Sequence, residues 1–305
     1  MSSDTETFPR PPLDAAALNA ALVRPGRMWR GVEVVPAVGS TNSELVARSA
    51  TGAPHGTVLV TEHQTAGRGR LGRVFTTPDR AALTFSVLLR PRVPTNALGW
   101  IPVIMGVAAV GAVRSVTGVR AVLKWPNDVL VTAAERAGGA GSAGADGDGG
   151  DHGAAGTAEN DGKLAGILSE ADFSAPDALG VVVGIGLNVS QDRCELPVDT
   201  AVSLRSEGAA DLDRGRLLTE LLREFEELYT PWSAAGGDAG ACGLAAAYRE
   251  LCVTIGRRVR VHLPGDGLLE GVAAGVDGDA RLLVDGPAGR TALSAGDVVH
   301  VRPGG

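Results

Sequence analysis

The segment from Thr65 to Arg73 (TAGRGRLGR) combines three arginines with three glycines. Glycine lets backbone N–H groups approach a ligand closely, and planar guanidinium groups match the oxygens of phosphate or carboxylate. The segment follows an expected strand and is too rich in glycine for a helix, so we expect a mobile loop that orders around an anion. The alternatives are a solvated basic turn or an arginine-glycine tract that binds RNA. A P-loop is excluded, because its Gly-Lys-Ser/Thr ending is missing.

The segment from Lys124 to Asp128 (KWPND) is a second candidate site. A lysine precedes a turn that presents an amide and a carboxylate side by side. Such a cluster suits a nucleoside triphosphate with its Mg²⁺, and Asp128 is the candidate metal ligand. The alternative is an ordinary turn in which Asn127 and Asp128 bond to their own backbone.

Two further segments lie at the ends of expected strands. The run from Lys163 to Glu170 (KLAGILSE) opens with a lysine whose ammonium group could lie over a phosphate. The alternative is a lysine at a strand end, which is commonplace. The run from Gly184 to Asn188 (GIGLN) ends a strand with two glycines and an amide, and it could equally be a tight bend from strand to loop.

The spacing of apolar residues predicts the elements that must hold these segments. We expect strands at 32–35, 57–61, 83–89, 122–125, 128–131, 163–170 and 181–188. We expect helices at 13–23, 101–116 and 212–230. A further helix should begin near Thr41, with Thr41 as its N-cap and Glu44 completing a capping box.

The composition of the chain predicts three parts. Residues 1–30 form an N-terminal tail with a short helix, and 31–250 form the larger domain. After about residue 250, valine-rich runs at 253–262, 268–276, 280–285 and 297–302 predict a small β-barrel over 251–305. Within the larger domain, 133–161 has no aliphatic residue larger than alanine, so it cannot offset its ordering entropy and is expected to be disordered. A neutral insertion is favoured over a regulatory segment.

The whole chain narrows the class of protein. The net charge of −7 does not describe the main part of the chain. Six acidic residues and one arginine lie in 133–161, and the remaining residues are together nearly neutral. Three cysteines at irregular spacing are expected to be free thiols in a reducing cytosol, and the five histidines form no metal-binding pair. No run of about 18 apolar residues exists, and the N-terminus resembles no signal peptide. We therefore expect a cytoplasmic protein that binds neither membrane nor nucleic acid.

Five motifs occur together in a specific order. They are Ser40-Thr41-Asn42, Glu62-His63-Gln64 with the arginine-glycine loop, Lys124 to Asp128, Lys163 to Leu168, and Gly184 to Asn188. In this order and spacing they resemble the biotin–protein ligases, over about residues 36–302. The resemblance implies an α+β fold, with a class II synthetase-like mixed and antiparallel sheet flanked by helices. It also implies that the C-terminal β-barrel is SH3-like.

The resemblance further implies a reaction in two steps. Biotin and ATP form biotinyl-5′-AMP, and biotin then passes to a lysine of a biotin carboxyl carrier domain of an acyl-CoA carboxylase. ATP and Mg²⁺ would be co-substrates, with no tightly bound prosthetic group. No enzyme nucleophile is required, which agrees with the absence of a Ser/His/Asp or Cys/His pattern. Catalysis would come from positioning and from positive charge at the phosphates.

The resemblance assigns a role to individual residues. Lys163 and Arg70 would be the catalytic residues. The residues that bind biotin or the adenylate would be Ser40, Thr41, Asn42, Gln64, Gly67, Arg68, Gly69, Arg70, Lys163, Gly166, Gly184 and Gly186. The residues that face ATP and Mg²⁺ would be Lys124, Asn127, Asp128 and Asn188, with Asp128 as the metal ligand.

The sequence departs from the family pattern at two places. Phe75 stands where some members carry a tryptophan. An aromatic side chain is still available as a lid over the adenine, and the sequence leaves open how well the adenylate is retained. The insert at 133–161 separates Asp128 from Lys163 by more than usual. About 30 residues precede the first expected strand, too few for the helix-turn-helix of about 60 residues in bifunctional members. We therefore expect a ligase alone, as a monomer or a homodimer.

Two alternatives stay open at the level of sequence. A lipoate or octanoate ligase or transferase shares the core fold and modifies a similar lysine. A non-catalytic protein, either a biotin-responsive regulator or an RNA-binding protein, is the alternative from another class. A regulator should carry a DNA-reading helix, and an RNA-binding protein should show a basic body with interleaved aromatic residues. Neither pattern is visible in the chain.

Overall fold

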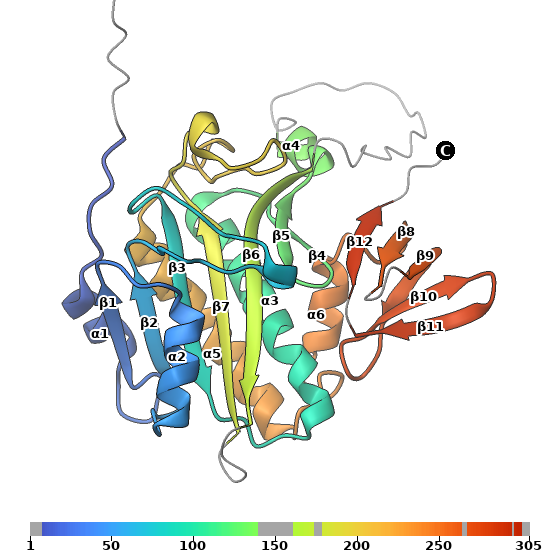
Figure 1. Ribbon diagram of the computed structural model, residues 1–305, viewed down its shortest axis with the longest axis horizontal. Helices are drawn as coiled ribbons and strands as arrows, with labels where there is room; N and C mark the ends of the chain where they lie inside the picture. The colour runs from blue at the N-terminus through green and yellow to red at the C-terminus, as the bar shows by residue number, and fades with distance from the viewer. Residues whose placement is uncertain (1–7, 140–160, 174–178, 264–266, 295, 301–305) are drawn as a thin grey trace, which may run out of the picture.

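A seven-stranded sheet forms the centre of the larger domain (Figure 1). The computed structural model describes residues 8–139, 161–173, 179–263, 267–294 and 296–300. In spatial order the strands are β1 (Gly31–Val35), β2 (Thr57–Thr61), β3 (Ala82–Leu89), β7 (Gly180–Asn188), β6 (Gly162–Asp172), β5 (Asp128–Val131) and β4 (Val122–Lys124). Strands β1 and β2 pair in parallel, and every other neighbouring pair is antiparallel.

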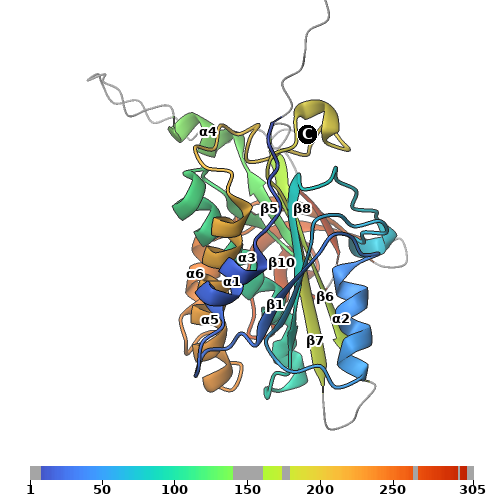
Figure 2. The same ribbon diagram turned by 90° about the vertical axis from the view of Figure 1, so that its left-hand side faces the viewer.

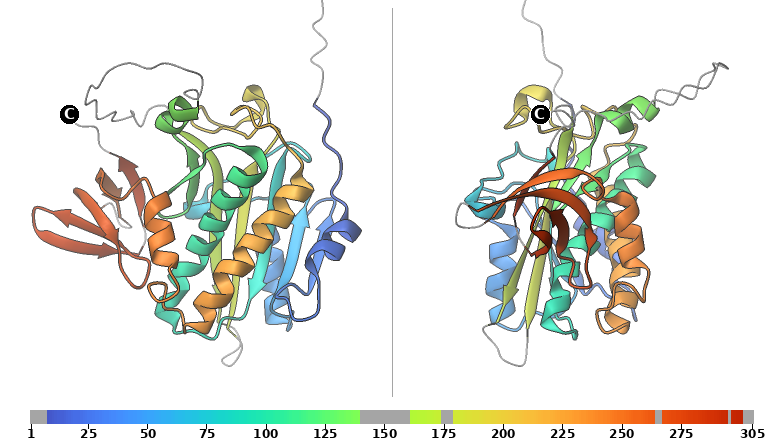
Figure 3. Two further views of the ribbon diagram at one scale, coloured as in Figure 1. Left: turned by 180° about the vertical axis from the view of Figure 1, so that it is seen from behind. Right: turned by 90° about the vertical axis from the view of Figure 1, so that its right-hand side faces the viewer.

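Helices cover the two faces of this sheet unequally (Figure 2). One face is covered by α1 (Ala15–Leu22), α3 (Trp100–Thr117), α5 (Arg214–Ala234) and α6 (Leu244–Leu251). The view from behind shows α3 and α5 side by side across the sheet (Figure 3). The opposite face carries α2 (Thr41–Ala50), which packs on β3, β6 and β7 and leaves the upper part of that face open.

The central strands and α3 form the core, because most of their residues are apolar and buried. Every residue of β3 and of β7 is buried, as expected for strands covered on both faces. The segment 95–117, which contains α3, is long and apolar enough to cross a membrane by length and composition, but 72% of its apolar window is buried inside the protein. Its burial identifies α3 as a core helix. It ends at Gly118, whose φ of +76° requires a left-handed backbone conformation.

The C-terminal part forms a separate five-stranded antiparallel sheet that curls beside the larger domain (Figure 3). Its strands, in spatial order, are β11 (Gly289–Leu293), β10 (Leu282–Gly286), β9 (Leu268–Val276), β8 (Arg258–His262) and β12 (Asp297–His300). Two tryptophans of the larger domain hold it in place. Trp100 Nε1 donates to Gly278 O at 2.7 Å, and Trp125 Nε1 donates to Ala280 O at 3.4 Å.

The fold class expected from sequence is confirmed, and most element positions agree with it. The elements missed were short or depended on partners: α6, β11 and the 3₁₀ helices η1 (Arg70–Gly72), η2 (Thr95–Gly99) and η4 (Arg193–Glu195). Strand β11 was not expected because its sequence is polar and largely exposed, and it forms through its hairpin with β10. The boundaries of the three predicted parts stay a prediction.

The N-cap of α2 was predicted wrongly. Ser40, rather than Thr41, is the N-cap, and its hydroxyl accepts a hydrogen bond from Ser43 N at 3.4 Å. Glu44 does not complete a capping box, because its carboxylate instead accepts from Arg48 at 2.8 Å, one turn later. Thr41 is unavailable for capping, because its hydroxyl points into a polar network described below.

The expected disorder of 133–161 is wrong at its start. Residues Ala133–Gly139 form the helix α4, which Thr132 caps by accepting from Glu135 N at 3.3 Å. Arg136 then pairs with Glu207 at 2.7 Å from a distant loop. These tertiary contacts supply the stabilisation that the composition lacks. Residues 140–160 lie outside the described residues.

A buried ion pair ties the N-terminal segment to the sheet. Arg214 Nη1 donates to Glu62 Oε2 at 2.6 Å, and both side chains are almost fully buried. The other carboxylate oxygen of Glu62 accepts from Leu13 N at 2.7 Å, and Arg214 Nη2 donates to Pro11 O at 2.7 Å. Each charge therefore has several partners, as a buried charge requires.

Replacing Arg214 with leucine should leave the Glu62 carboxylate buried without its cation. We expect Arg214→Leu to lower the free energy of unfolding by about 3 kcal/mol, measured by urea denaturation. Arg216→Leu is the matched control, since Arg216 pairs with Asp211 at the surface and its loss should change stability by less than about 1 kcal/mol. Equal losses in the two variants would contradict the role given to the buried pair.

Candidate functional site

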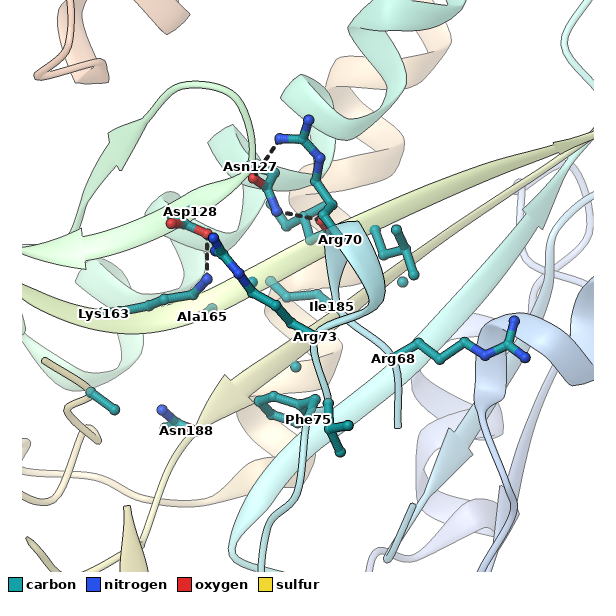
Figure 4. A pocket seen from close by; sticks show the side chains of 18 of the residues that line it. Arg68, Arg70, Arg73, Phe75, Asn127, Asp128, Lys163, Ala165, Ile185 and Asn188 are labelled. Carbon is teal, nitrogen blue, oxygen red and sulfur yellow. Dashed lines mark hydrogen bonds and ion pairs between the residues drawn. The ribbon is translucent and has the colours of Figure 1, made fainter. Parts of the chain in front are cut away.

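A cavity of about 570 Å³ opens on the sheet face that α2 leaves uncovered (Figure 4). Segments that lie far apart in the sequence line it together. They are residues 40–42, 64, 68–70, 73–76, 84, 124–128, 163, 165–168, 184–186, 188, 197–198, 200–201 and 298–299. All of the candidate site residues named from the sequence, except Gly67, line it.

Polar groups at the start of α2 form one end of the cavity. The backbone N–H of Thr41 donates to Gln64 Oε1 at 2.8 Å, and the Thr41 hydroxyl lies 3.2 Å from the same oxygen. The Ser86 hydroxyl on β3 lies 2.7 Å from Thr41 Oγ1 and 2.6 Å from Asn42 Oδ1. Ser40, the helix cap, completes this wall.

Asn42 is held in a fixed orientation by three elements. Its Nδ2 group donates to Leu168 O at 3.1 Å and to Glu170 Oε2 at 2.9 Å, both on β6. Its Oδ1 atom must then accept, so the Ser86 hydroxyl is the donor of the 2.6 Å bond. This network fixes the polar end of the cavity before any ligand arrives.

Gly184 is required by this arrangement. A Cβ atom at Gly184 would collide with Asn42 Oδ1 and would lie 2.6 Å from Ser86 Oγ. On the same strand, a Cβ at Gly186 would lie 2.6 Å from ring atoms of Phe75. In this structure both glycines therefore make room for protein side chains, whereas the resemblance implied that they bind biotin or the adenylate.

The arginine-glycine segment forms a short closed turn. Gly69 N donates to Arg73 O at 2.7 Å, and Phe75 N donates to Gly67 O at 3.0 Å. Gly67 permits this closure, because a Cβ there would collide with Phe75 O and approach Gln64 Nε2. Arg70 begins the 3₁₀ turn η1, where the sequence predicted a loop without helical structure.

The three arginines of the turn point in different directions. Arg70 Nη1 donates to Asn127 Oδ1 at 3.1 Å, and Asn127 Nδ2 in turn donates to Ile167 O at 2.9 Å. Figure 4 shows Arg73 reaching toward Asp128 and Lys163. Arg68 points away from that group, although it borders the cavity.

An ion pair lies at the charged end of the cavity. Lys163 Nζ on β6 is 2.6 Å from Asp128 Oδ1 on β5, and the two side chains are 40% and 22% exposed. Lys163 is also fixed through its backbone, because its N–H donates to Thr200 O at 2.6 Å. A Cβ atom added at Gly166 would lie 3.5 Å from Cε and Nζ of Lys163, which is an ordinary van der Waals contact. Lys124 borders the same end, as the cross-strand partner of Asp128.

Asn188 was expected to face a triphosphate, but its amide is already used. Its Nδ2 group donates to Val202 O at 2.9 Å, and its Oδ1 accepts from Gln191 Nε2 at 3.0 Å. Asn188 therefore holds the loop that carries Thr200 against the cavity. We expect it to position that loop.

Sequence reasoning missed several residues of the cavity. Arg73 belongs to the same tract as Arg68 and Arg70, so its residue type could have placed it in the site. Ser86 carried no signal, because a serine in a buried strand is unremarkable until Asn42 is placed beside it. Val298 and Val299 come from β12 of the C-terminal sheet, and only tertiary structure brings them to the cavity.

Comparisons with known proteins agree with this architecture. Residues 35–188 match the family described as the biotin/lipoate A/B protein ligase family, and residues 254–301 match the biotin protein ligase C terminal domain. Among solved structures, the biotin protein ligase from Aquifex aeolicus in complex with biotin and ATP has a TM-score of 0.67. It is 24% identical and covers 90% of this chain and 100% of its own, so it supports the fold.

Two curated relatives are similar over most of this chain. Biotin–[acetyl-CoA-carboxylase] ligase of Mycobacterium tuberculosis is 41% identical over 298 residues, which cover 96% of this chain and 97% of the relative. The bifunctional ligase/repressor BirA of Escherichia coli is 28% identical over 257 residues, which cover 83% of this chain and 69% of the relative.

The packing around Gly184 can be tested by adding one methyl group. Gly184→Ala should displace Asn42 or Ser86 and lower the free energy of unfolding by about 1–3 kcal/mol, measured by urea denaturation. Gly31→Ala on β1 is the matched control, since no heavy atom lies within 4 Å of its added Cβ and we expect no loss. A Gly184→Ala variant as stable as Gly31→Ala would contradict the close packing of Asn42.

Proposed function

Because the chain belongs to the biotin/lipoate A/B protein ligase family, we infer that it is an ATP-dependent ligase that joins biotin to a lysine of a carrier protein. The observation that carries this conclusion is the gathering of the five motifs around one cavity, in a chain 41% identical to a biotin ligase over nearly its whole length. The cavity supplies a fixed polar end and a cationic end, which suits an acid and a nucleotide joined between them.

In the first step a carboxylate oxygen of biotin attacks the α-phosphorus of ATP. A bond forms between that oxygen and phosphorus, the bond to the β-phosphate oxygen breaks, and pyrophosphate leaves. Two anionic groups must approach each other, so the step needs fixed positive charge. We assign this task to Lys163 and Arg70, with Arg73 as a third cation suggested by its direction in Figure 4.

Lys163 must change partner for this to occur. In the structure Asp128 holds its ammonium group at 2.6 Å, which fixes the direction of the side chain. A phosphate oxygen that arrives between them would compete with the carboxylate for the same donors, since an ammonium group has three. The ion pair thus keeps Lys163 extended along the cavity wall until the nucleotide binds.

In the second step the neutral amine of the acceptor lysine attacks the carbonyl carbon of the biotinyl-adenylate. An amide bond forms, the bond between the acyl carbon and the phosphate oxygen breaks, AMP leaves, and the attacking nitrogen releases one proton. The mixed anhydride must be shielded from water until then. We propose that the turn carrying Arg68, Gly69 and Arg70, with Phe75 behind it, forms the cover over the adenylate.

The residues of the cavity fit Mg²⁺ that arrives with ATP rather than a resident ion. Mg²⁺ usually keeps phosphate and water oxygens and takes one or two carboxylates from the protein. Asp128 is the carboxylate among the residues that line the cavity, and the described residues contain no cluster of three potential metal ligands. Asp128 would supply one oxygen, with Lys124 and Asn127 beside the triphosphate. Bound Mg²⁺ would neutralise charge on the phosphates.

Biotin is the proposed acid because the polar end of the cavity is built to hold a group that forms several hydrogen bonds. Thr41, Asn42 and Gln64 present such groups there, together with Ser40. Lipoate and octanoate end in apolar groups, which would cover these polar groups and offer them no hydrogen bonds. The acceptor we propose is the biotin carboxyl carrier domain of an acyl-CoA carboxylase, in the cytoplasm, without nucleic acid or membrane.

The direct test is incubation with Mg²⁺-ATP, a carrier domain and one acid at a time. With biotin, intact-mass analysis should show one added biotinyl group on the carrier, whereas lipoate and octanoate should give none. Omission of ATP is the control for non-enzymatic modification. Modification with lipoate or octanoate and none with biotin would overturn the choice of acid.

The role of Lys163 predicts a specific kinetic defect. Lys163→Ala should slow biotin-dependent adenylate formation about a hundredfold, because one charged donor to the developing phosphate charge is lost. Pyrophosphate release measures this step. Lys163→Arg should retain part of the rate by keeping the charge, and Arg216→Ala, at a surface ion pair, should match the unaltered protein. An unchanged rate in Lys163→Ala would refute the assignment.

A further inference from the structure

The segment that follows α6 extends the edge of the larger sheet beside the nucleotide end of the cavity. Val253 N donates to Leu123 O at 2.9 Å, and Cys252 forms a parallel bridge with Leu123 on β4. One residue further along, the Trp125 N–H donates to the Thr254 hydroxyl at 3.1 Å. A side chain therefore provides the acceptor at the point where β4 turns toward Asp128.

The Thr254 hydroxyl is held from the other side by the C-terminal sheet. Thr254 is completely buried, and His300 Nε2 on β12 lies 3.2 Å from its Oγ1 atom. His300 Nδ1 lies 3.3 Å from Arg257 Nη1, and Arg257 lies 3.9 Å from the carboxylate of Asp161. A continuous chain of polar contacts thus joins the C-terminal sheet to the Trp125 backbone.

The chemistry of the partners fixes the direction of each hydrogen bond. A guanidinium group can only donate, so His300 Nδ1 is the acceptor from Arg257. In the neutral imidazole the proton then lies on Nε2, which donates to Thr254 Oγ1. The Thr254 oxygen accepts from both His300 and the Trp125 N–H, which uses its two lone pairs.

The surroundings keep the His300 ring in this neutral form. Burial and the positive charges of Lys124 and Arg257 lower the pKa of His300 to about 4, with burial the largest cause. Asp161, beyond Arg257, is the acidic group at the far end of the chain. The imidazole therefore acts at neutral pH as a fixed donor and acceptor.

We propose that Thr254 and His300 are positioning residues for the nucleotide, through their hold on the end of β4. Lys124 and Asp128 are cross-strand partners on either side of the turn that begins at Trp125, so a shift of the Trp125 backbone moves both. Val298, on the same strand as His300, also lines the cavity. The proposal deepens the proposed function and rests on its assignment of Lys124 and Asp128 to the triphosphate.

The biotin end of the cavity should not depend on this chain of contacts. Thr41, Asn42 and Gln64 are fixed by bonds among α2, β3, β6 and the segment after β2, and none of these bonds involves the C-terminal sheet. Replacing Thr254 or His300 should therefore weaken nucleotide binding and leave biotin binding unchanged. A general loss of folding would weaken the binding of both substrates.

The test compares two variants that remove the contact with two that preserve it. Thr254→Val leaves the Trp125 N–H without its acceptor and should weaken binding of Mg²⁺ with a non-hydrolysable ATP analogue about tenfold. His300→Leu removes the second hold but leaves that bond, so about threefold is expected. Thr254→Ser and His300→Gln should bind like the unaltered protein, since a Gln amide supplies both a donor and an acceptor. Isothermal calorimetry with the analogue and, separately, with biotin gives the affinities.

We expect all four variants to bind biotin with unchanged affinity. Thr254→Val and His300→Leu should lose affinity for the nucleotide analogue, whereas Thr254→Ser and His300→Gln should keep it. Equal loss of biotin and nucleotide affinity, or unchanged nucleotide affinity in both Thr254→Val and His300→Leu, would overturn the proposal. His300→Leu keeps the test usable where Thr254→Val fails to fold. The binding test does not depend on transfer of biotin to a carrier. If the unaltered protein binds both ligands but modifies no carrier, the proposed function is refuted, and the binding results still test the roles of Thr254 and His300.

Discussion

The site depends on how β5 and β6 pair. Their register shifts between Val129 and Leu130, which pair with Ala165 and Lys163, so Leu164 has no partner on β5. Such a β-bulge bends a strand and redirects a side chain, and bulges are frequent beside active sites. Here it accompanies the approach of Lys163 to Asp128 at 2.6 Å. Without a fixed register, a slip of one residue would turn the ammonium group to the other face of the sheet.

The two ends of the cavity are built by different means. At the polar end, neutral groups of Thr41, Asn42 and Ser86 satisfy one another, and Gly184 leaves the space they need. At the charged end, Lys163 and Asp128 hold each other while remaining partly exposed, and we propose that an incoming phosphate replaces one partner. This difference suits the chemistry, because the acid is recognised before reaction whereas charge develops at the phosphate during it.

Much of this arrangement could be predicted from the sequence. The spacing of apolar residues located β3 and β7, and residue types in order located the segments around Lys124 and Lys163. What could not be predicted depended on distant partners. Ser40 replaced Thr41 as the cap because Gln64 and Ser86 engage the Thr41 hydroxyl, and α4 is supported by the pairing of Arg136 with Glu207. No local pattern reports such contacts, since each joins segments separated by many residues.

The central claim is that the bond between the acyl group and AMP forms beside Lys163. A crystal structure with a non-hydrolysable analogue of biotinyl-5′-AMP tests it directly. We expect an oxygen at the acyl–phosphate junction to lie about 3 Å from Lys163 Nζ, and Lys163 Nζ to lie farther from Asp128 Oδ1 than the present 2.6 Å. An analogue bound elsewhere, or a Lys163 side chain still held by Asp128 and out of reach of the junction, would contradict it.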